Sequence, residues 1–359
     1  MRLGIIKEGT SRLRSKSNNM ALTLTQTADL TKKSLIFGAI FLFLLIASWV
    51  GYMYYINFVY IPPPPPETPP DVFFGKLPKL KITEASNSAG SYAYTLDTDT
   101  GSLPRDIPKI FKVYPIASLG TDLLAPDRSK ALANKLGFIT GPEMQSLTQY
   151  LFLDENGGDM VVSLESGNFR FNHRESTESA NLTMTNNFSD PERLTKDFKD
   201  FLLPMDLLKE QLRDGRSEVF YEKPSINESN FATITLWQED VDKIPLVTEK
   251  FEEGLIKGVI NKRSDNRQKV LILDYVFWPI DILNGHTYPI LTPEEAYDKL
   301  QTQQGFVIKK PLGLKVSITK VYLGYFLSRE FQPFLQPVFV FEGDEFVAFV
   351  PALRDEQVE

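Results

Sequence analysis

The chain has 359 residues, of which 42% are hydrophobic and 24% charged, and its formal net charge is −7. These values are typical of globular proteins and exclude a largely disordered chain or a protein with many membrane spans. Cysteine is absent, which excludes disulfide bonds, cysteine-ligated metal centres and thiol catalysis. Only His173 and His286 could serve mechanisms that need an imidazole group.

The charge is distributed unevenly along the chain. Residues 1–33 contain seven basic and two acidic side chains, residues 34–60 contain no charged side chain, and the remainder is acidic. An acidic domain repels phosphate backbones, so nucleic acid is not an expected partner.

The uncharged segment 34–60 is long enough to cross the hydrocarbon core of a lipid bilayer as a helix. Because the basic residues precede it, residues 1–33 are predicted to be a cytoplasmic tail and residues 61–359 to be exported. A cleaved signal peptide fits less well, since the apolar run is long and no small-residue cleavage site follows it. The sequence therefore predicts a single-pass signal anchor, and an exported domain without cysteine favours a prokaryotic envelope.

A proline-rich segment at 61–70 predicts a semi-rigid polyproline stalk. Beyond it we expect an α+β exported region of two lobes, 71–189 and 190–359. Helices are expected from a cap at Asp127 to Leu136, where Gly137 ends the helix, and from the Asp190-Pro191 pair onward. Period-2 alternation predicts strands at 149–153, 160–164, 168–172, 218–221, 232–238, 255–261 and 270–278.

The last part of the chain repeats this plan. Thr292 and Glu295 have the spacing of a capping box, which predicts a helix with Ala296 and Leu300 on its apolar face. Strands are then expected at 314–323, 337–341 and 346–350. A short helix followed by a three-stranded meander in both 127–172 and 292–350 predicts a duplicated α+β unit.

Two runs carry a family resemblance. The run 131–138 before a meander, and the run 293–300 followed by 321–325 and 335–341, resemble PepSY-type and YycH/YycI-type extracytoplasmic modules. The resemblance covers about half of the exported region and contains no catalytic motif. It implies one N-terminal anchor, no cofactor, and regulation or inhibition of envelope partners without catalysis.

The spacing of Ser317 and Lys320 matches the Ser-x-x-Lys pattern of penicillin-binding enzymes. Those enzymes need both side chains together at the start of a helix, whereas residues i and i+3 of the predicted strand point to opposite faces. The Lys-Thr-Gly motif of such enzymes is also absent. No catalytic residue is therefore assigned.

Acidic turns could bind a cation, but each has a simpler explanation. The segment 97–101 begins like a calcium loop and lacks the later ligands of an EF-hand. Asp154, Glu155 and Asp159 surround the tip of a predicted hairpin, where acidic side chains are common. His173 and His286 have no second histidine at ligand spacing, so no metal site is assigned.

The C-terminal hairpin is apolar on both of its faces, and the helix from Thr292 can cover only one of them. The other face is expected to pack on the preceding lobe, through strands near 232–237 and 270–278, or to bind a partner. The possible partner face consists of Val338, Phe339, Val340, Phe341, Phe346 and Phe349.

These patterns predict a membrane-anchored extracytoplasmic interaction or regulatory protein, not an enzyme, that binds another envelope protein or a peptide. Two alternatives belong to other classes. The first is a membrane-anchored cell-wall hydrolase, and the second is a bitopic structural subunit of a secretion or pilus machine.

Overall fold

The structure is a computed structural model that describes residues 24–55, 69–83, 92–117, 120, 122–174, 188–262 and 270–359. The chain divides into two units, Met1–Thr68 and Pro69–Glu359. Most of the predicted tail 1–33 and stalk 61–70 lies outside the described residues.

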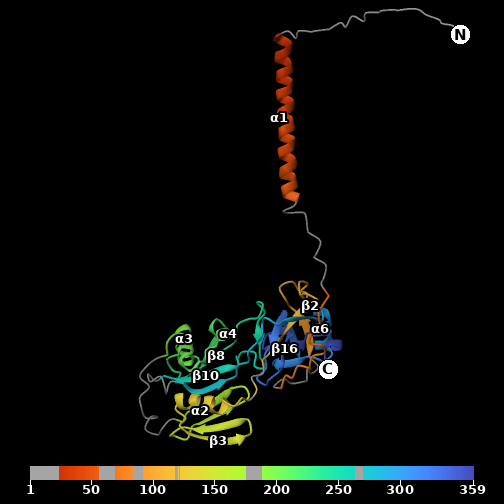
Figure 1. Cartoon of the computed structure of the whole chain (residues 1–359). Coiled ribbons are helices and arrows are strands. Elements are labelled where there is room, and N and C mark those ends of the chain that lie inside the picture. The colour runs from red at the N-terminus through yellow and green to blue at the C-terminus, as the bar shows by residue number, and fades with distance from the viewer. Residues whose placement is uncertain are drawn as a thin grey trace, which may run out of the picture. The chain divides into compact units, whose positions relative to one another are not determined.

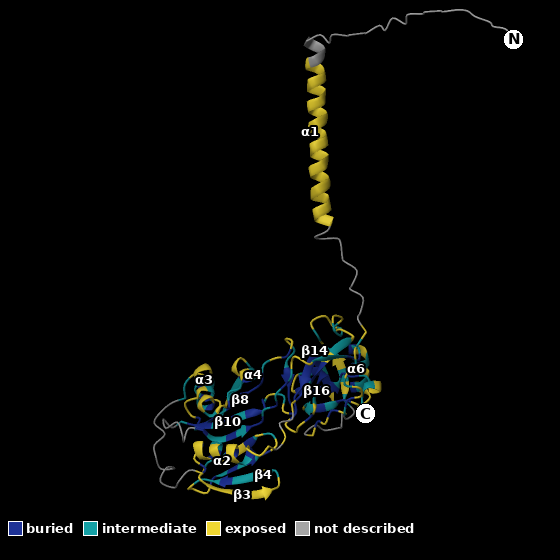
Figure 2. Cartoon of the chain, viewed as in Figure 1, coloured by how far each residue is buried: buried dark blue, intermediate teal, exposed yellow. Residues whose placement is uncertain are grey.

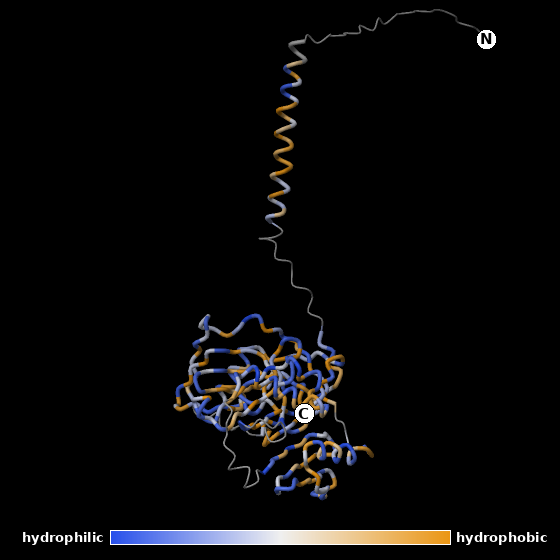
Figure 3. The backbone as a smooth tube through the Cα atoms, turned by 90° about the vertical axis from the view of Figure 1, so that its left-hand side faces the viewer, coloured by the Kyte–Doolittle hydropathy of each residue, from blue (hydrophilic) through white to orange (hydrophobic). Residues whose placement is uncertain are grey.

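The first unit contains helix α1 (Leu24–Tyr54), which is drawn in red to orange in Figure 1. Residues 28–54 of α1 are long and apolar enough to cross a membrane, and Figure 3 shows apolar residues along most of this stretch. The helix begins ten positions before the predicted start at Ser34, so Lys32 and Lys33 lie inside it. Threonine, alanine, leucine and lysine all tolerate helical backbone, so the loss of charge at Ser34 does not mark the helix start. An N-terminal apolar helix of this kind is compatible with a membrane anchor or with a signal sequence.

The second unit is built on two eight-stranded sheets. We call the first the flanking sheet, and its core order is β1-β14-β15-β16-β13. Strand β2 pairs with β12 and β15, and β9 pairs with β14. The bounds are β1 Ala93–Leu96, β2 Ile110–Pro115, β9 Leu246–Val247, β12 His286–Pro289, β13 Phe306–Lys309, β14 Lys315–Phe326, β15 Phe334–Gly343 and β16 Phe346–Pro351.

The other sheet, here the inserted sheet, has the order β3-β4-β5-β6-β11-β10-β8-β7. All of its pairings are antiparallel. Its strands fall in sequence between β2 and β12, so this sheet is an insertion into the flanking sheet. The bounds are β3 Thr140–Ser146, β4 Gln149–Leu153, β5 Asp159–Ser163, β6 Phe169–Asn172, β7 Ser217–Tyr221, β8 Phe231–Leu236, β10 Ile256–Asn261 and β11 Val270–Tyr275.

The predicted lobe boundary between residues 189 and 190 does not separate the two sheets. Strand β6, from the predicted first lobe, pairs with β11 from the predicted second lobe, because the meander β3–β6 would otherwise leave an apolar edge unpaired. The predicted repeat also differs in strand order. Strands β3 to β6 pair in sequence after helix α2 (Ala125–Lys135). After α6 (Pro293–Gln301), by contrast, the first strand β13 pairs with the last, β16.

Helix boundaries follow the local capping chemistry. Asp190 accepts the amide of Arg193 and begins α3 (Pro191–Leu202), and Thr292 and Glu295 form the predicted capping box of α6. Asp127 is not a cap: α2 begins after Leu124 without a side-chain cap, because Pro126 fixes the first turn two residues earlier. Gly137 has φ +91° and ends α2 as expected. The remaining helical elements are η3 (Leu203–Met205), α4 (Glu210–Arg213) and η4 (Asp355–Gln357).

Helices α2 and α3 cover one face of the inserted sheet, where Phe138, Phe171 and Phe198 are buried in a single core. Helix α6 covers one face of the flanking sheet through Ala296 and Leu300. Figure 2 shows the contrast between the dark blue strands β14 and β16 and the exposed strand β3.

The other face of the C-terminal hairpin is also covered, by Leu80, Ile82 and Val247 with the half-buried Phe251. This corrects the predicted partner face. All six of its residues are 0% exposed: Val338, Phe339, Val340, Phe341, Phe346 and Phe349. The cover is not the predicted pair of strands near 232–237 and 270–278. It consists of the segment 80–82 and the β9 region, which the sequence did not mark as strands over this sheet.

Candidate functional site

The inserted sheet has one face that α2 and α3 do not cover, here the open face. Strand alternation places side chains of opposite character on the two faces. One register row crosses the open face through Arg170, Asp274, Lys257, Thr235 and Glu218, so charges of both signs alternate along it. The neighbouring row contains Ile272, Val259, Thr233 and Phe220.

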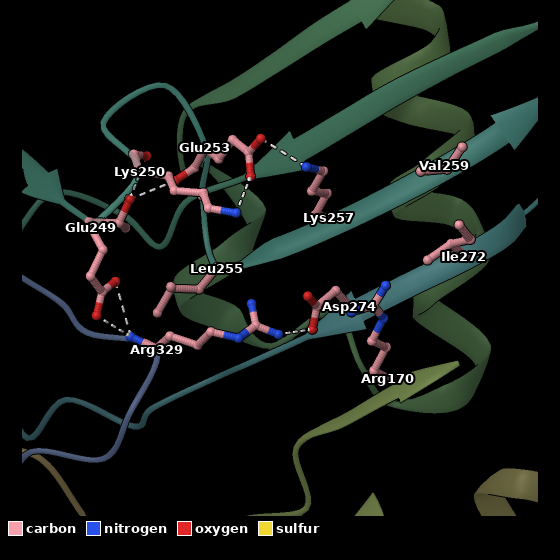
Figure 4. A pocket seen from close by; sticks show the side chains of 12 residues that line it. Arg170, Glu249, Lys250, Glu253, Leu255, Lys257, Val259, Ile272, Asp274 and Arg329 are labelled. Carbon is pink, nitrogen blue, oxygen red and sulfur yellow. Dashed lines mark hydrogen bonds and ion pairs between the residues drawn. The ribbon is translucent and has the colours of Figure 1, made fainter. Parts of the chain in front are cut away.

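A cleft of about 420 Å³ lies on this face. Its floor contains Val259 and Ile272, both half-buried, and its walls come from the loop after β9 and the loop after β14. Figure 4 shows Glu249, Arg329, Asp274 and Lys257 around this space. The cleft therefore combines an apolar floor with charged walls contributed by both sheets.

The loop 248–254 is held in place by its own hydrogen bonds. The Thr248 hydroxyl donates to the carbonyl oxygens of Lys250 (2.8 Å) and Glu253 (2.6 Å). The amide of Gly254 donates to the hydroxyl of Thr235 at 2.6 Å. A Cβ at Gly254 would lie 2.0 Å from the Leu236 carbonyl oxygen, so only glycine allows the loop to approach the sheet this closely.

Glu249 fixes the second wall. Its carboxylate is buried and accepts hydrogen bonds from the Ser328 hydroxyl and from the Arg329 amide, the latter at 2.9 Å. The Arg329 guanidinium then reaches down to Asp274 on β11 and pairs with it. A buried carboxylate with several donors is a strong structural contact, so this wall is pre-formed.

The basic groups of the cleft differ in how they are neutralised. Lys257 pairs with Glu253 at 2.8 Å and Arg329 pairs with Asp274. Arg170, which is exposed, forms no hydrogen bond or ion pair with any other residue that the structure describes. A ligand carboxylate could therefore bind Arg170 without displacing an internal partner.

This arrangement suits recognition better than acid–base chemistry. The cleft carboxylates Glu253, Asp274 and Glu249 each already accept hydrogen bonds from internal donors. The floor can take an apolar side chain while Arg170 takes an acidic group next to it. The ligand that fits is a peptide segment with a carboxylate beside an apolar side chain.

The predicted Ser-x-x-Lys pair lies on β14, as expected. The Ser317 hydroxyl contacts Asp97 at 3.3 Å, and Lys320 lies 4.0 Å from Glu342, on the far side of a register shift in the strand. The structure does not bring Ser317 and Lys320 into a shared site. A Ser-Asp-Asn triplet, another motif of penicillin-binding enzymes, occurs at 264–266, outside the described residues.

The acidic turns are closed by internal hydrogen bonds. The carboxylate of Asp154 accepts the amides of Asn156 (2.9 Å) and Gly158 (2.6 Å) and contacts His173 Nδ1 at 3.0 Å. Burial raises the pKa of Asp154, but the hydrogen bonds from His173, Gly158 and Asn156 outweigh it and hold the pKa below its usual value. Within the described ranges no group of three or more His, Asp or Glu side chains is arranged to hold a metal ion.

The segment 97–101 also forms a closed turn, in which the Thr98 hydroxyl donates to the Ser102 carbonyl oxygen at 2.8 Å. Residues 98–100 line a shallow hollow of about 730 Å³ together with Lys320 and Tyr322. The Tyr322 hydroxyl donates to Glu342, and burial raises the pKa of Tyr322.

The two histidines have parallel environments. His173 stacks on Phe138 and contacts Asp154, whereas His286 stacks on Phe73 and contacts Asp71 at 2.7 Å. The hydrogen bond from His286 is the main reason that the pKa of Asp71 lies below its usual value. His286 begins strand β12 and not the predicted turn. Each histidine therefore fastens a loop or segment to a strand.

The comparisons with known proteins are sparse. No protein-family model matches the chain, and no curated protein matches it. A crystal structure of an uncharacterized protein from Eubacterium rectale is similar at 12% sequence identity and a TM-score of 0.35. The match covers 67% of this chain and 83% of that one.

Sequence reasoning missed the cleft. One signal was present: Lys257 and Asp274 are charged positions inside otherwise apolar strands, which indicates that one face of those strands is exposed. Glu249 and Arg329 had no such signal, because they come from loops 80 residues apart that only the folded chain brings together.

Proposed function

We propose that the protein is a membrane-anchored extracytoplasmic binding protein, with its N-terminus in the cytoplasm, that acts on another envelope protein without catalysing a reaction. The observation that carries this proposal is the charged cleft on the open face of the inserted sheet. It offers an apolar floor and the guanidinium of Arg170, which has no partner among the described residues.

The ligand follows from this chemistry. An extended segment of an envelope protein can place an apolar side chain on Val259 and Ile272 and a carboxylate on Arg170. Since the cleft is pre-formed by Glu249 and the loop 248–254, little ordering free energy opposes binding. The role resembles that of the PepSY-type and YycH/YycI-type modules, which regulate envelope partners.

A photo-cross-linking amino acid at Val259 in the full-length protein tests this function in native membranes. We expect one predominant cross-linked protein, identified by mass spectrometry. A matched probe at Arg193, an exposed position on α3 over the covered face, should not capture it. Equal capture from both positions would overturn the proposal.

The purified partner then allows a quantitative test. Arg170→Ala should weaken binding at least about tenfold, because a hydrogen bond to a charged group contributes about 1.5–3 kcal/mol. Arg193→Ala should leave the dissociation constant unchanged. A partner that binds both variants as tightly as the wild type would show that the cleft is not the binding site.

Membrane orientation is tested separately. A tag after Glu359 should be digested by protease added outside intact cells, or in the periplasm where an outer membrane is present. A tag before Met1 should be protected, because the basic residues of 1–33 favour the cytoplasmic side. The reverse pattern would overturn the extracytoplasmic role.

A further inference from the structure

The two edge strands of the inserted sheet differ in how well they are protected against pairing with another strand. Strand β3 has two register irregularities against β4 and contains Pro142, which lacks an amide donor. Strand β7 pairs with β8 over five consecutive residues without irregularity and contains no proline and no lysine. Strand β7 is therefore the open edge.

The direction of the free backbone groups on β7 follows from its pairing with β8. The amide of Glu222 donates to Phe231, and the amide of Trp237 donates to Arg216, so even-numbered residues of this strand bond to β8. In an antiparallel ladder the alternate residues face away. The amides and carbonyls of Ser217, Val219 and Tyr221 therefore point outward, and no backbone group of the described chain pairs with them.

We propose that β7 pairs with β7 of a second copy of this chain, antiparallel, about a two-fold axis that passes through Val219. In this register Val219 lies opposite Val219 of the second copy, and Ser217 lies opposite Tyr221. All three opposed pairs use the outward backbone groups, which gives about six new hydrogen bonds. The two inserted sheets then form one continuous sheet.

Charge complementarity selects this occupant. The same register places Arg216 of each copy opposite Glu222 of the other, on the open face, so the interface closes with an oppositely charged pair at each end. Arg216 stacks over the Trp237 ring at 3.9 Å, which holds its stem while the guanidinium stays partly exposed. An isologous two-fold contact needs this kind of self-complementarity.

The geometry also suits two anchored copies. A two-fold axis through an antiparallel strand pair runs perpendicular to the sheet, so corresponding points of the two copies remain on the same side of it. Both stalk attachments at Asp71 therefore face the same side, whatever their position, and a single bilayer can hold both anchors. The inference is independent of the cleft and of its ligand.

Cysteine cross-linking in the full-length protein tests the register, because the natural chain contains no cysteine. Val219→Cys should form disulfide-linked dimers in native membranes, since opposed residues of a hydrogen-bonded pair have Cα atoms about 5.5 Å apart, within disulfide reach. Ser217→Cys alone should not, because its equivalent lies about 13 Å away in this register. Co-expressed Ser217→Cys and Tyr221→Cys chains should cross-link to each other.

The matched control is Glu143→Cys on the other edge strand, β3. Dimers at Val219→Cys in excess of this control, together with no dimers at Ser217→Cys, support the proposal. Cross-linking that is equal at all three positions, or absent from Val219→Cys, overturns it. Contact through the anchor helices alone would give no dependence on register.

A charge exchange tests the same pairing through the wild-type side chains. Arg216→Glu should reduce the Val219→Cys dimer yield severalfold, because it opposes like charges at both ends of the interface. Arg216→Glu combined with Glu222→Arg should restore the yield. Thermal unfolding shows whether both variants fold, and failure of the folded double variant to restore the yield contradicts the proposal.

Discussion

The two sheets of the folded unit differ in how their faces are used. The flanking sheet is covered on both faces, so Val338 and Phe341, which point to opposite sides, are each completely buried. The inserted sheet is covered on one face only, and its other face holds alternating charges and a cleft. The most apolar part of the chain is therefore structural, and the surface suited to binding lies where apolar and charged side chains alternate.

The largest expected effect breaks this comparison directly. Phe341→Asp should prevent folding, because even truncation of a buried phenylalanine to alanine costs about 3–5 kcal/mol and the variant adds a buried charge. Val259→Asp, on the open face, should cost about 1 kcal/mol or less. Thermal unfolding of both variants measures the difference. Comparable losses would mean that the open face is covered in the native protein.

A second prediction compares glycines. Gly258→Ala should destabilise the inserted sheet by about 1–3 kcal/mol, because the new Cβ would lie 2.4 Å from the Phe198 ring on the covered face. Gly313→Ala is the control, since nothing lies within 4 Å of its Cβ position. Chemical denaturation should show a loss only at position 258. A neutral Gly258→Ala would show that α3 does not press on β10.

Helix capping gives a smaller effect that is comparable in the two sheets. Thr292→Ala removes the cap of α6, and Asp190→Ala removes the cap of α3. Each should lower the free energy of unfolding by about 1 kcal/mol. Thr302→Ala, at the other end of α6, serves as the control for loss of a surface hydroxyl. If Asp190→Ala is silent while Thr292→Ala is not, α3 contributes less to its sheet than α6 does.

The smallest effects concern the two histidine–aspartate contacts. Both Asp154 and Asp71 have lowered pKa values in the folded protein, so each stabilises it above the unfolded pKa of about 3.9. That stability is lost as pH falls below about 4 towards the folded pKa. The melting-temperature difference between wild type and Asp154→Asn should therefore shrink below pH 4. Asp71→Asn should behave alike with a smaller amplitude, because Asp71 is half exposed.

A pH-independent difference for either variant would show that its carboxylate is not held ionised by its histidine contact. Unfolding curves recorded between pH 3 and pH 7 distinguish the two outcomes.

Local signals in the sequence predicted local structure well. Asp190, Gly137 and the Thr292–Glu295 box mark helix ends because capping depends on a few neighbouring residues. The strands 149–153, 218–221 and 346–350 follow from alternation or apolar runs. Strands β1, β2 and β12 were missed because each is four to six residues long, and distant partners decide their pairing.

Long-range arrangement escaped the sequence for the same reason. The apolar hairpin 337–350 predicted that something must cover both faces, but nothing in Leu80 or Val247 indicates that these residues supply the cover. Ser328 and Arg329 contact Glu249 only because the β9 region pairs in parallel with the end of β14. The cleft arises from that pairing and not from a motif.

The insertion of one sheet into the other has a consequence for the order of folding during export. Strand β1 pairs with β14 and β2 with β12, so the first strands to emerge have no partner until most of the chain has followed. The inserted sheet draws all its strands from residues 140–275 and can assemble earlier. The flanking sheet must therefore close last, and contacts of such large sequence separation form slowly. Until it closes, the apolar β2 segment depends on chaperones or on the translocation machinery for protection.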